Sequence, residues 1–501
     1  MTVAAFTEAV INGLRRFLRI EPAEENRTVM IREPYTHEGN CAKNRIWYRG
    51  IPSQLTAFYR AVNADNGTMF WSARETAGME IRKIHTGMPS IVIDCVTQII
   101  CNDFNGIEID GAERDVNTEA WESIARENDF DHLFEQAIRE CATVGDGAFK
   151  LSADPGISDK IIIEFFPAER VRFKRQRGRI REIAFLTAIS HDRREYLLTE
   201  TYSYGAIRYK LEDREGRELP LDAIPETAWM TDGNVSFDSS LIWAVPMIYG
   251  HSAVFDGRGK SLIENKDYAG DALDEALSQW MDALRSGRTK TYIPETLIPR
   301  DPVTLTPVKP NAFDNRYIAT GADMSEHGGN KITTVSPSIP HDAYLSTYIT
   351  ALDAYLQGII SPSTIGIDVK KLDNAEAQRE KEKTTLYTRQ NFVEMVQKAL
   401  PQLVRCVLNA DRALHNKPLI TAEDFEVKAK FGEYANPSFE SQVETVGKAL
   451  TAGIMSIEQG VEELYGDSKT DDWKSEEVAR IKQEQGIAEM EQPYEADDIE
   501  V

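Results

Sequence analysis

Apolar and polar positions follow a helical period over much of the N-terminal part of the chain. Between residues 88 and 103 apolar residues recur every three or four positions, with polar residues between them. This spacing places the apolar side chains on one face of an amphipathic helix. Residues 1–20 have the same spacing, with apolar positions at Phe6, Val10, Leu14, Phe17 and Leu18. We therefore expect the first 145 residues to be mostly helical.

From residue 147 to about 245 the period changes to two. Short runs rich in isoleucine, phenylalanine and tyrosine alternate with turn residues. This pattern is typical of a small antiparallel sheet. The stretch RFKRQRGRIREIAF predicts a hairpin with Gly178 at its turn.

Helical spacing returns in two segments that flank a different kind of sequence. Residues 256–287 predict one helix and residues 341–358 a second. The second helix has one apolar face, formed by Tyr344, Tyr348, Leu352 and Leu356. Residues 288–340 between them are rich in proline, threonine and glycine and are too long for a plain connection. We expect a small β-containing module at the tip of a two-helix stalk.

A loop, residues 359–374, leads into a long helix predicted from Ala375 to about Asn409. Its first turns, AEAQREKEKTT, are almost wholly polar, so they face solvent, a partner subunit or a wide aqueous space. Its later turns have one apolar face, made of Phe392, Val393, Val396, Leu400, Leu403, Val404 and Val407. Pro401 removes a backbone donor and predicts a kink.

The C-terminal part predicts an extended segment up to residue 436 and short helices over 437–490. The last residues, 491–501, are acidic and are expected to be disordered. The whole pattern therefore favours an α+β fold that is mainly helical.

The charge of the chain limits its partners. Its 501 residues carry a formal net charge of −24, whereas tight DNA binding depends on cationic neutralisation of phosphates. An acidic wall repels DNA, which is useful only where DNA must pass without sticking; the plainer explanation is solubility. The five cysteines are scattered without a CxxC pair, which favours reduced thiols.

The motif GRGKS, Gly257 to Ser261, resembles the end of a phosphate-binding loop. The full motif requires a glycine where this chain has Val254. A glycine-rich turn that opens the next helix is the plainer explanation. A nucleic-acid-acting enzyme with a degenerate phosphate-binding loop is therefore the alternative function. The sequence contains no HExxH motif, His/Cys cluster or GxSxG motif, so we expect no enzyme, cofactor or metal.

The run from Arg170 to Arg181 is the sharpest basic feature, since seven of its twelve residues are arginine or lysine. It could contact nucleic acid or an acidic partner. Because the rest of the chain is so acidic, the plainer explanation is an exposed hairpin whose basic side chains pair with acidic neighbours, including those of an adjacent subunit. The candidate residues of this basic hairpin are Arg172, Lys174, Arg175, Arg177 and Arg179.

Four stretches, taken in order, resemble the portal (head–tail connector) proteins of tailed bacteriophages, especially long-tailed siphophages. They are KNRIWYRGIPSQLTAFYR, GRGKSLIENKDYAGDALDEALSQWMDALRSGRTKTYIPE, GIISPSTIGIDVKKLDNAEAQREKEKTTLYTR and PSFESQVETVGKALTAGIMSIEQGVEELYGD. The resemblance spans about residues 40 to 485. Their order carries more weight than any single motif.

The resemblance implies a ring, typically of twelve subunits, at one capsid vertex. Such a ring is the channel through which a terminase packages DNA and DNA later leaves, and the platform for head–tail joining. The implied regions are wing 1–255, first stem helix 256–287, clip 288–340, second stem helix 341–358, tunnel loop 359–374, long wing helix and extended segment 375–436, crown 437–490 and acidic tail 491–501.

The resemblance also implies partners and contact residues. The implied partners are terminase, a head-completion (adaptor) protein, major capsid and scaffolding proteins, and double-stranded DNA bound without sequence specificity, with no membrane. The implied locations are the virion and, during assembly, the host cytoplasm. The tunnel loop would face DNA through Ser361, Thr364, Lys370 and Lys371, although both lysines could instead pair with Asp373 or Glu376. The clip would dock its partners through Arg288, Lys290, Arg300 and Lys309.

Overall fold

The computed structural model describes most of the chain and divides it into two compact units. The first unit is Met1–Phe431 and the second is Gly432–Val501. The described residues are 36–62, 68–74, 81–111, 113–154, 156–230, 234–294, 298, 300–303, 317–320, 332–367, 375–420, 425–432, 439–465 and 471–484. The helix predicted over residues 1–20 and the acidic tail 491–501 lie outside them.

Amphipathic helices form the N-terminal part of the first unit, as the period of the sequence predicts. They are α2 (His37–Arg49), α3 (Pro52–Val62), α4 (Met88–Asp103), α5 (Arg114–Glu127) and α6 (Phe130–Val144). On α4, Val92, Val96 and Ile100 are at most 2% exposed, whereas Ile91 is 41% exposed. The packed face is therefore narrower than the apolar stripe in the sequence.

The region with a period of two forms antiparallel sheets, which confirms the prediction. One sheet has the strand order β10-β2-β3; the other has the order β4-β5-β6-β7-β8, with β9 paired to β7. Arg177 and Gly178 form the turn between β4 and β5, and both have positive φ, the geometry that two-residue hairpin turns prefer. The strands are β2 (Asp146–Ser152), β3 (Ile162–Pro167), β4 (Val171–Gln176), β5 (Arg179–His191), β6 (Arg194–Ser203), β7 (Ala206–Asp213), β8 (Glu218–Leu219), β9 (Asn234–Ser236) and β10 (Ala244–Ile248).

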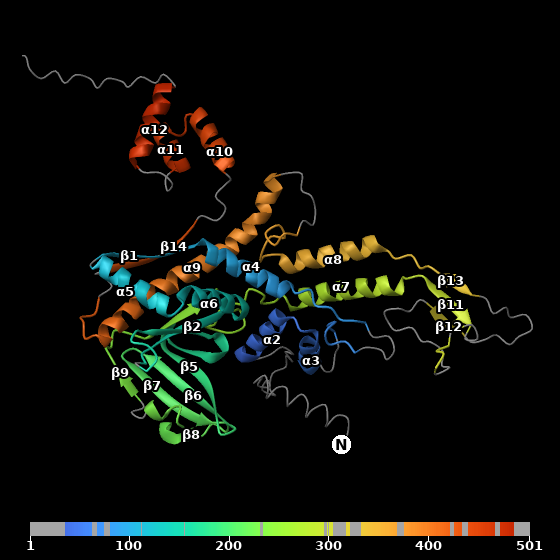
Figure 1. The fold of residues 1–501 in the computed structure, drawn as a ribbon, viewed down its shortest axis with the longest axis horizontal. Helices are drawn as coiled ribbons and strands as arrows, with labels where there is room; N and C mark the ends of the chain where they lie inside the picture. The colour runs from blue at the N-terminus through green and yellow to red at the C-terminus, as the bar shows by residue number, and fades with distance from the viewer. Residues whose placement is uncertain are drawn as a thin grey trace, which may run out of the picture. The chain divides into compact units, whose positions relative to one another are not determined.

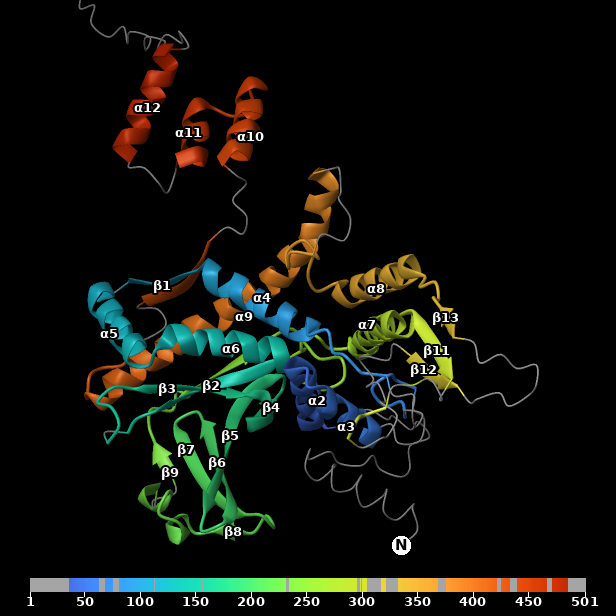
Figure 2. The ribbon, with the colours of Figure 1, turned by 45° about the vertical axis from the view of Figure 1, so that its right-hand side comes forward.

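Two helices predicted on either side of the Pro- and Thr-rich stretch are present and pack against each other. They are α7 (Asp267–Ser286) and α8 (His341–Leu356), and both views show them side by side (Figures 1 and 2). The stretch between them contains a small three-stranded sheet, which confirms its β character. Its strands, in the order β12-β11-β13, are β11 (Lys290–Pro294), β12 (Tyr317–Thr320) and β13 (Thr333–Val335).

The long helix α9 (Ala375–Leu414) supplies the centre of the core. Its predicted apolar face is confirmed, because every member of that face is at most 5% exposed. The helix continues through Pro401 and ends five residues later than predicted. It packs against β10 and against β14 (Phe425–Phe431), which pairs with β1 (Phe104–Gly111). The side chains of its first turns lie outside the described residues, so the orientation of its charged end stays a prediction.

The second unit is helical over its described residues, as predicted. Its helices are α10 (Phe439–Thr451), α11 (Ile457–Tyr465) and α12 (Asp471–Glu484). The Ser456 hydroxyl caps α11 by accepting the Gln459 N–H at 3.2 Å. Val446 and Val461 are buried between α10 and α11, beside Gly460.

The described part of the chain contains no helix long and apolar enough to cross a membrane. It also contains no group of three or more His, Cys, Asp or Glu side chains placed to hold a metal ion.

Candidate functional site

The candidate site is the α7–α8 pair together with the segments at its two ends. Contacts at both ends show that the helices are antiparallel. Lys266, just before α7, donates to the carbonyl of Gln357, just after α8, at 2.7 Å. At the opposite end Gly287 lies so close to Ile339 that an added Cβ would fall 2.3 Å from its Cγ1.

One face of α7 holds an extended segment of the chain through buried polar side chains. Asp271, Asp274 and Ser278 lie on this face at spacings of three and four residues and are at most 6% exposed. We call these three residues the α7 clamp. The segment that they hold comprises the described residues 69–74 and 81–86, and we call it the clamped segment.

The α7 clamp binds mainly the backbone of the clamped segment. The two carboxylate oxygens of Asp271 accept the N–H groups of Phe70 and Trp71 at 2.8 and 3.0 Å. The Ser278 hydroxyl accepts the Ile84 N–H at 2.9 Å. Backbone donors that are not in a helix or sheet need such partners when they are buried.

Asp274 is the most heavily used member of the clamp. One of its oxygens accepts the Thr86 N–H at 2.8 Å and the Thr86 hydroxyl at 2.9 Å. The other lies 2.7 Å from Nδ1 of His85 and accepts the Trp71 indole N–H at 3.1 Å. Asp274 and His85 are both almost fully buried, so this carboxylate depends on these donors in place of water.

Burial makes the charge on Asp271 expensive. Desolvation raises the pKa of its carboxyl to about 6, and the nearby Glu275 and Asp274 act in the same direction. The two backbone N–H groups that it accepts act in the opposite direction. This carboxyl therefore titrates at mildly acidic pH.

The outward surfaces of the pair are acidic and partly apolar. On α7, Glu275 and Asp282 are half-buried, and the other three carboxylates are taken up by Lys43 or by the clamped segment. On α8, Asp342 and Asp353 are exposed, and this helix has no Lys or Arg. Tyr268, Leu284 and Leu345 are 67%, 41% and 42% exposed. The pair thus combines an excess of negative charge with apolar side chains that the described chain leaves uncovered.

The loop after α8 is tied to α9 by hydroxyl groups. The Ser361 N–H donates to the Thr385 hydroxyl at 2.9 Å, and the Thr364 and Thr385 hydroxyls lie 3.0 Å apart. Ser361 is only 2% exposed, so it anchors the loop and does not present its side chain to solvent. Lys370 and Lys371 lie outside the described residues.

The predicted clip residues follow α7 along the chain. Arg288 is exposed just after the helix, and Lys290, half-buried, begins β11. Arg300 is exposed in the short described stretch 300–303. Lys309 lies outside the described residues. The Thr289 and Ser336 hydroxyls, 2.7 Å apart, join the two chain segments that enter and leave this module.

The basic hairpin is partly neutralised within the chain. Arg172 pairs with Glu38 at 2.7 Å, and Lys174 pairs with Glu182 at 3.1 Å. Arg175 donates to the carbonyl of Gly257 at 2.8 Å. Because β4 is an edge strand of its sheet, its charged side chains also discourage edge-to-edge pairing.

Two arginines of the basic hairpin remain at its turn. Arg177 and Arg179 are exposed, and neither has an ion-pair partner among the described residues. Pairing with acidic neighbours within the chain therefore accounts for Arg172 and Lys174, and not for the two arginines at the turn.

The GRGKS motif is held in place by hydrogen bonds to the end of α6 and the start of β2. Buried Asp146 accepts the Gly259 N–H at 2.7 Å and one guanidinium N–H of Arg258 at 2.7 Å. Burial raises the pKa of Asp146, and the adjacent Arg258 opposes that rise. Ser261 donates to the carbonyl of Thr143 at 2.7 Å. A carboxylate of the protein thus takes up donors that a phosphate-binding loop would offer to its ligand, which argues against the alternative function.

Sequence reasoning missed the α7 clamp. The sequence pattern that could have revealed it is the helical spacing of Asp271, Asp274 and Ser278, which places polar residues among the apolar positions of α7. Nothing in the sequence indicated which segment those residues would hold, because Asp271 and Phe70 are 201 positions apart.

Comparisons with known proteins give no family assignment. No protein-family model matches the chain, and no curated protein matches it. Among solved structures, a chain of the virion of a native gene transfer agent (GTA) particle is 12% identical, with 88% of this chain and 93% of that chain covered and a TM-score of 0.38.

Two further similar chains come from the necks of such particles. One, in the neck of a native particle computed with C12 symmetry, is 14% identical, with 76% and 90% of the two chains covered and a TM-score of 0.38. The other, in the neck of an empty particle computed with C6 symmetry, is 15% identical, with the same shares covered and a TM-score of 0.35. With TM-scores below 0.5, these similarities do not assign a function to the chain.

Proposed function

We propose that this chain is the subunit of a portal ring. The ring is the channel at one capsid vertex through which a terminase packages DNA and through which DNA leaves, and it is the platform for head–tail joining. The single observation that supports this best is the antiparallel α7–α8 pair, which encloses a three-stranded sheet and is followed by a loop and the 40-residue helix α9.

The surface of the pair suits a ring. Tyr268, Leu284 and Leu345 are exposed in the single chain, and contact with neighbouring copies would bury them. Identical copies that meet through two different surfaces form a ring when the rotation between neighbouring copies closes. The four carboxylates that the pair leaves half-buried or exposed suit a channel wall, because DNA phosphates bind to cations and are repelled by negative charge.

The other regions take their roles from this arrangement. The segment that contains β11 to β13, which includes Arg288, Lys290, Arg300 and Lys309, docks terminase and later the head-completion protein. The loop around Thr364, Lys370 and Lys371 faces passing DNA, and buried Ser361 anchors it. Capsid and scaffolding proteins contact the outer parts. The protein assembles in the host cytoplasm and stays in the virion.

Negative-stain electron microscopy of the purified protein, together with its native mass, tests the proposal. We expect rings with a central hole and a mass near twelve chains. Some ring proteins need a scaffold, so the measurement is repeated with scaffolding and capsid proteins present. Chains that stay single under both conditions would overturn the proposal.

A further inference from the structure

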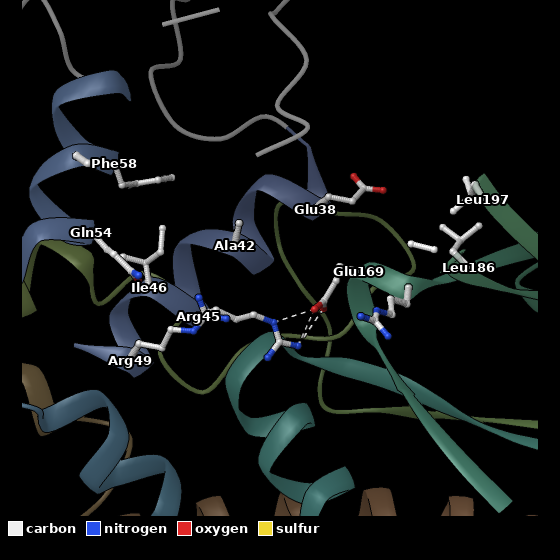
Figure 3. A pocket seen from close by; sticks show the side chains of 13 residues that line it. Glu38, Ala42, Arg45, Ile46, Arg49, Gln54, Phe58, Glu169, Leu186 and Leu197 are labelled. Atoms are coloured by element: carbon white, nitrogen blue, oxygen red, sulfur yellow. Dashed lines mark hydrogen bonds and ion pairs between the residues drawn. The ribbon is translucent and has the colours of Figure 1, made fainter. Parts of the chain in front are cut away.

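A groove of about 510 Å³ lies between helices α2 and α3 and the six-stranded sheet (Figure 3). Its most buried members are Phe58 on α3 and Leu186 on β5, which are 2% and 8% exposed. Ile46 on α2 and Leu197 on β6 are half-buried and complete the apolar lining. The volume falls in the range of roughly 300–1,000 Å³ that is usual for binding sites.

The edge of the groove is polar, and only part of its positive charge is neutralised by ion pairs among the described residues. Arg45 is neutralised by Glu140 and Glu169 at 2.6 and 2.8 Å. Arg49 and Arg170 line the groove, are exposed, and have no ion-pair partner among the described residues. An apolar floor with cationic groups at its edge fits an amphipathic helix that also carries a carboxylate.

The chain itself contains a segment with these properties. Residues 1–20 have apolar positions at spacings of four, four and three or four residues, the anchor pattern of a helix that lies in a groove. Glu8 is the one carboxylate in this segment, while Arg15, Arg16 and Arg19 make its other positions basic. The segment therefore offers an apolar face for the floor and a carboxylate for Arg49 or Arg170.

The place where the described chain begins favours the groove's own chain as the source. Thr36 is the N-cap of α2, and Glu38, on the first turn of α2, lines the groove. Residues 21–35 would span at most about 50 Å when fully extended. So short a connection keeps residues 1–20 at high effective concentration beside the groove.

We propose that residues 1–20 dock as an amphipathic helix in the groove of their own chain. The apolar anchors contact Phe58, Ile46 and Leu197, and Glu8 pairs with an arginine at the edge. This docking does not depend on the proposed function, because it takes place within one chain.

Hydrogen exchange of the full-length protein, followed by mass spectrometry, tests the docking. We expect the amides of residues 6–18 to exchange about tenfold faster in Ala57→Glu, because a charge then projects into the groove. Ala188→Glu, from the opposite wall, gives a second test; both alanines are exposed, so both variants should fold. Ala223→Glu, an exposed alanine away from the groove, is the matched control and leaves the exchange unchanged.

The segment is tested in the same way. Leu14→Glu is expected to speed exchange of residues 6–18, and Asn12→Glu, on the polar side, is not. Fast exchange in the unchanged protein, or slow exchange that survives both groove variants, would overturn the docking.

Cross-linking identifies the source of the segment. A photoreactive benzoylphenylalanine at position 14 is used in a mixture of isotopically heavy and light chains. Cross-links to residues 46–58 within one chain support the proposal. Cross-links between heavy and light chains would place a neighbour's segment in the groove and overturn it.

Discussion

Asp274 is a buried carboxylate whose hydrogen bonds join the two stretches of the clamped segment through Trp71, His85 and Thr86. Replacement by asparagine turns one acceptor oxygen into a donor, which then faces the indole N–H of Trp71 and the ring of His85. Unpaired buried donors cost about 1–3 kcal/mol each. We therefore expect Asp274→Asn to lower the free energy of unfolding by about 2–5 kcal/mol in denaturant titrations.

Glu275→Gln is the matched control for Asp274→Asn. Glu275 is the next residue on α7, and among the described residues its side chain accepts one exposed hydrogen bond, from Gln279 at 2.7 Å. Its replacement should change the free energy of unfolding by less than about 0.5 kcal/mol. Equal effects of the two substitutions would show that the clamp does not stabilise the fold.

Asp271 gives the protein a stability that depends on pH. Its folded-state pKa, about 6, is raised above the usual value of 3.8, so the folded state binds this proton more tightly than the unfolded state. Protonation of Asp271 therefore contributes to the free energy of unfolding. This contribution is fully present below about pH 4 and is lost as the pH rises through about 6. It amounts to about 2–3 kcal/mol.

The variant Asp271→Asn tests this because it removes the titration. The difference in free energy of unfolding between the unchanged protein and the variant should be larger at pH 4.5 than at pH 7.5. Denaturant titrations at the two pH values measure it. A difference that is constant or that grows with pH would contradict the expected direction.

At the scale of elements, two basic residues of the GRGKS turn allow its structural role to be tested apart from a role in phosphate binding. Arg258 donates to Asp146 and to the carbonyls of Ala168 and Val171, whereas Lys260 is exposed. Arg258→Ala would leave Asp146 buried without its cation and should cost about 3–5 kcal/mol. Lys260→Ala should cost less than about 0.5 kcal/mol.

The same two variants bear on nucleotide binding. In a phosphate-binding loop the lysine is the essential residue. If Lys260→Ala abolished a measurable ATP hydrolysis, the structural account of the motif would fail. We expect no hydrolysis to be lost, and calorimetry with ATP should give no heat of binding for either protein.

Elements with a continuous local pattern were predictable, and elements defined by distant contacts were not. The apolar face of α9 and the hairpin turn at Gly178 follow from spacing and from the positive φ that glycine adopts easily. The exposure of Ile91 was missed, because an apolar stripe does not reveal how much of it neighbouring elements cover. The α7 clamp was missed because it joins elements about 200 positions apart.

At the scale of the whole molecule, substitutions in the loop after α8 can test DNA packaging separately from ring assembly. Lys370 and Lys371 are the few cations that the sequence places there. Replacing both with glutamate should impair DNA packaging while rings still form, because contact with phosphates is electrostatic and independent of sequence. Packaging assays and electron microscopy of the same preparation measure both properties.

Lys417 provides a comparison for the loop lysines. It lies in the described stretch after α9 and is exposed, so Lys417→Glu changes the charge elsewhere. This single change should leave packaging intact. Normal packaging by the double loop variant would contradict a role of these lysines in DNA contact.

The clamp also has a consequence for synthesis of the chain. The ribosome makes Phe70 and Trp71 about 200 residues before it makes Asp271 and Asp274. At about 5–20 residues per second, the interval between them is roughly 10–40 s. During that interval the large side chain of Trp71, which is fully buried in the folded chain, lacks α7, and the Phe70 N–H lacks its acceptor. The nascent chain is therefore expected to engage chaperones at this segment until α7 has emerged.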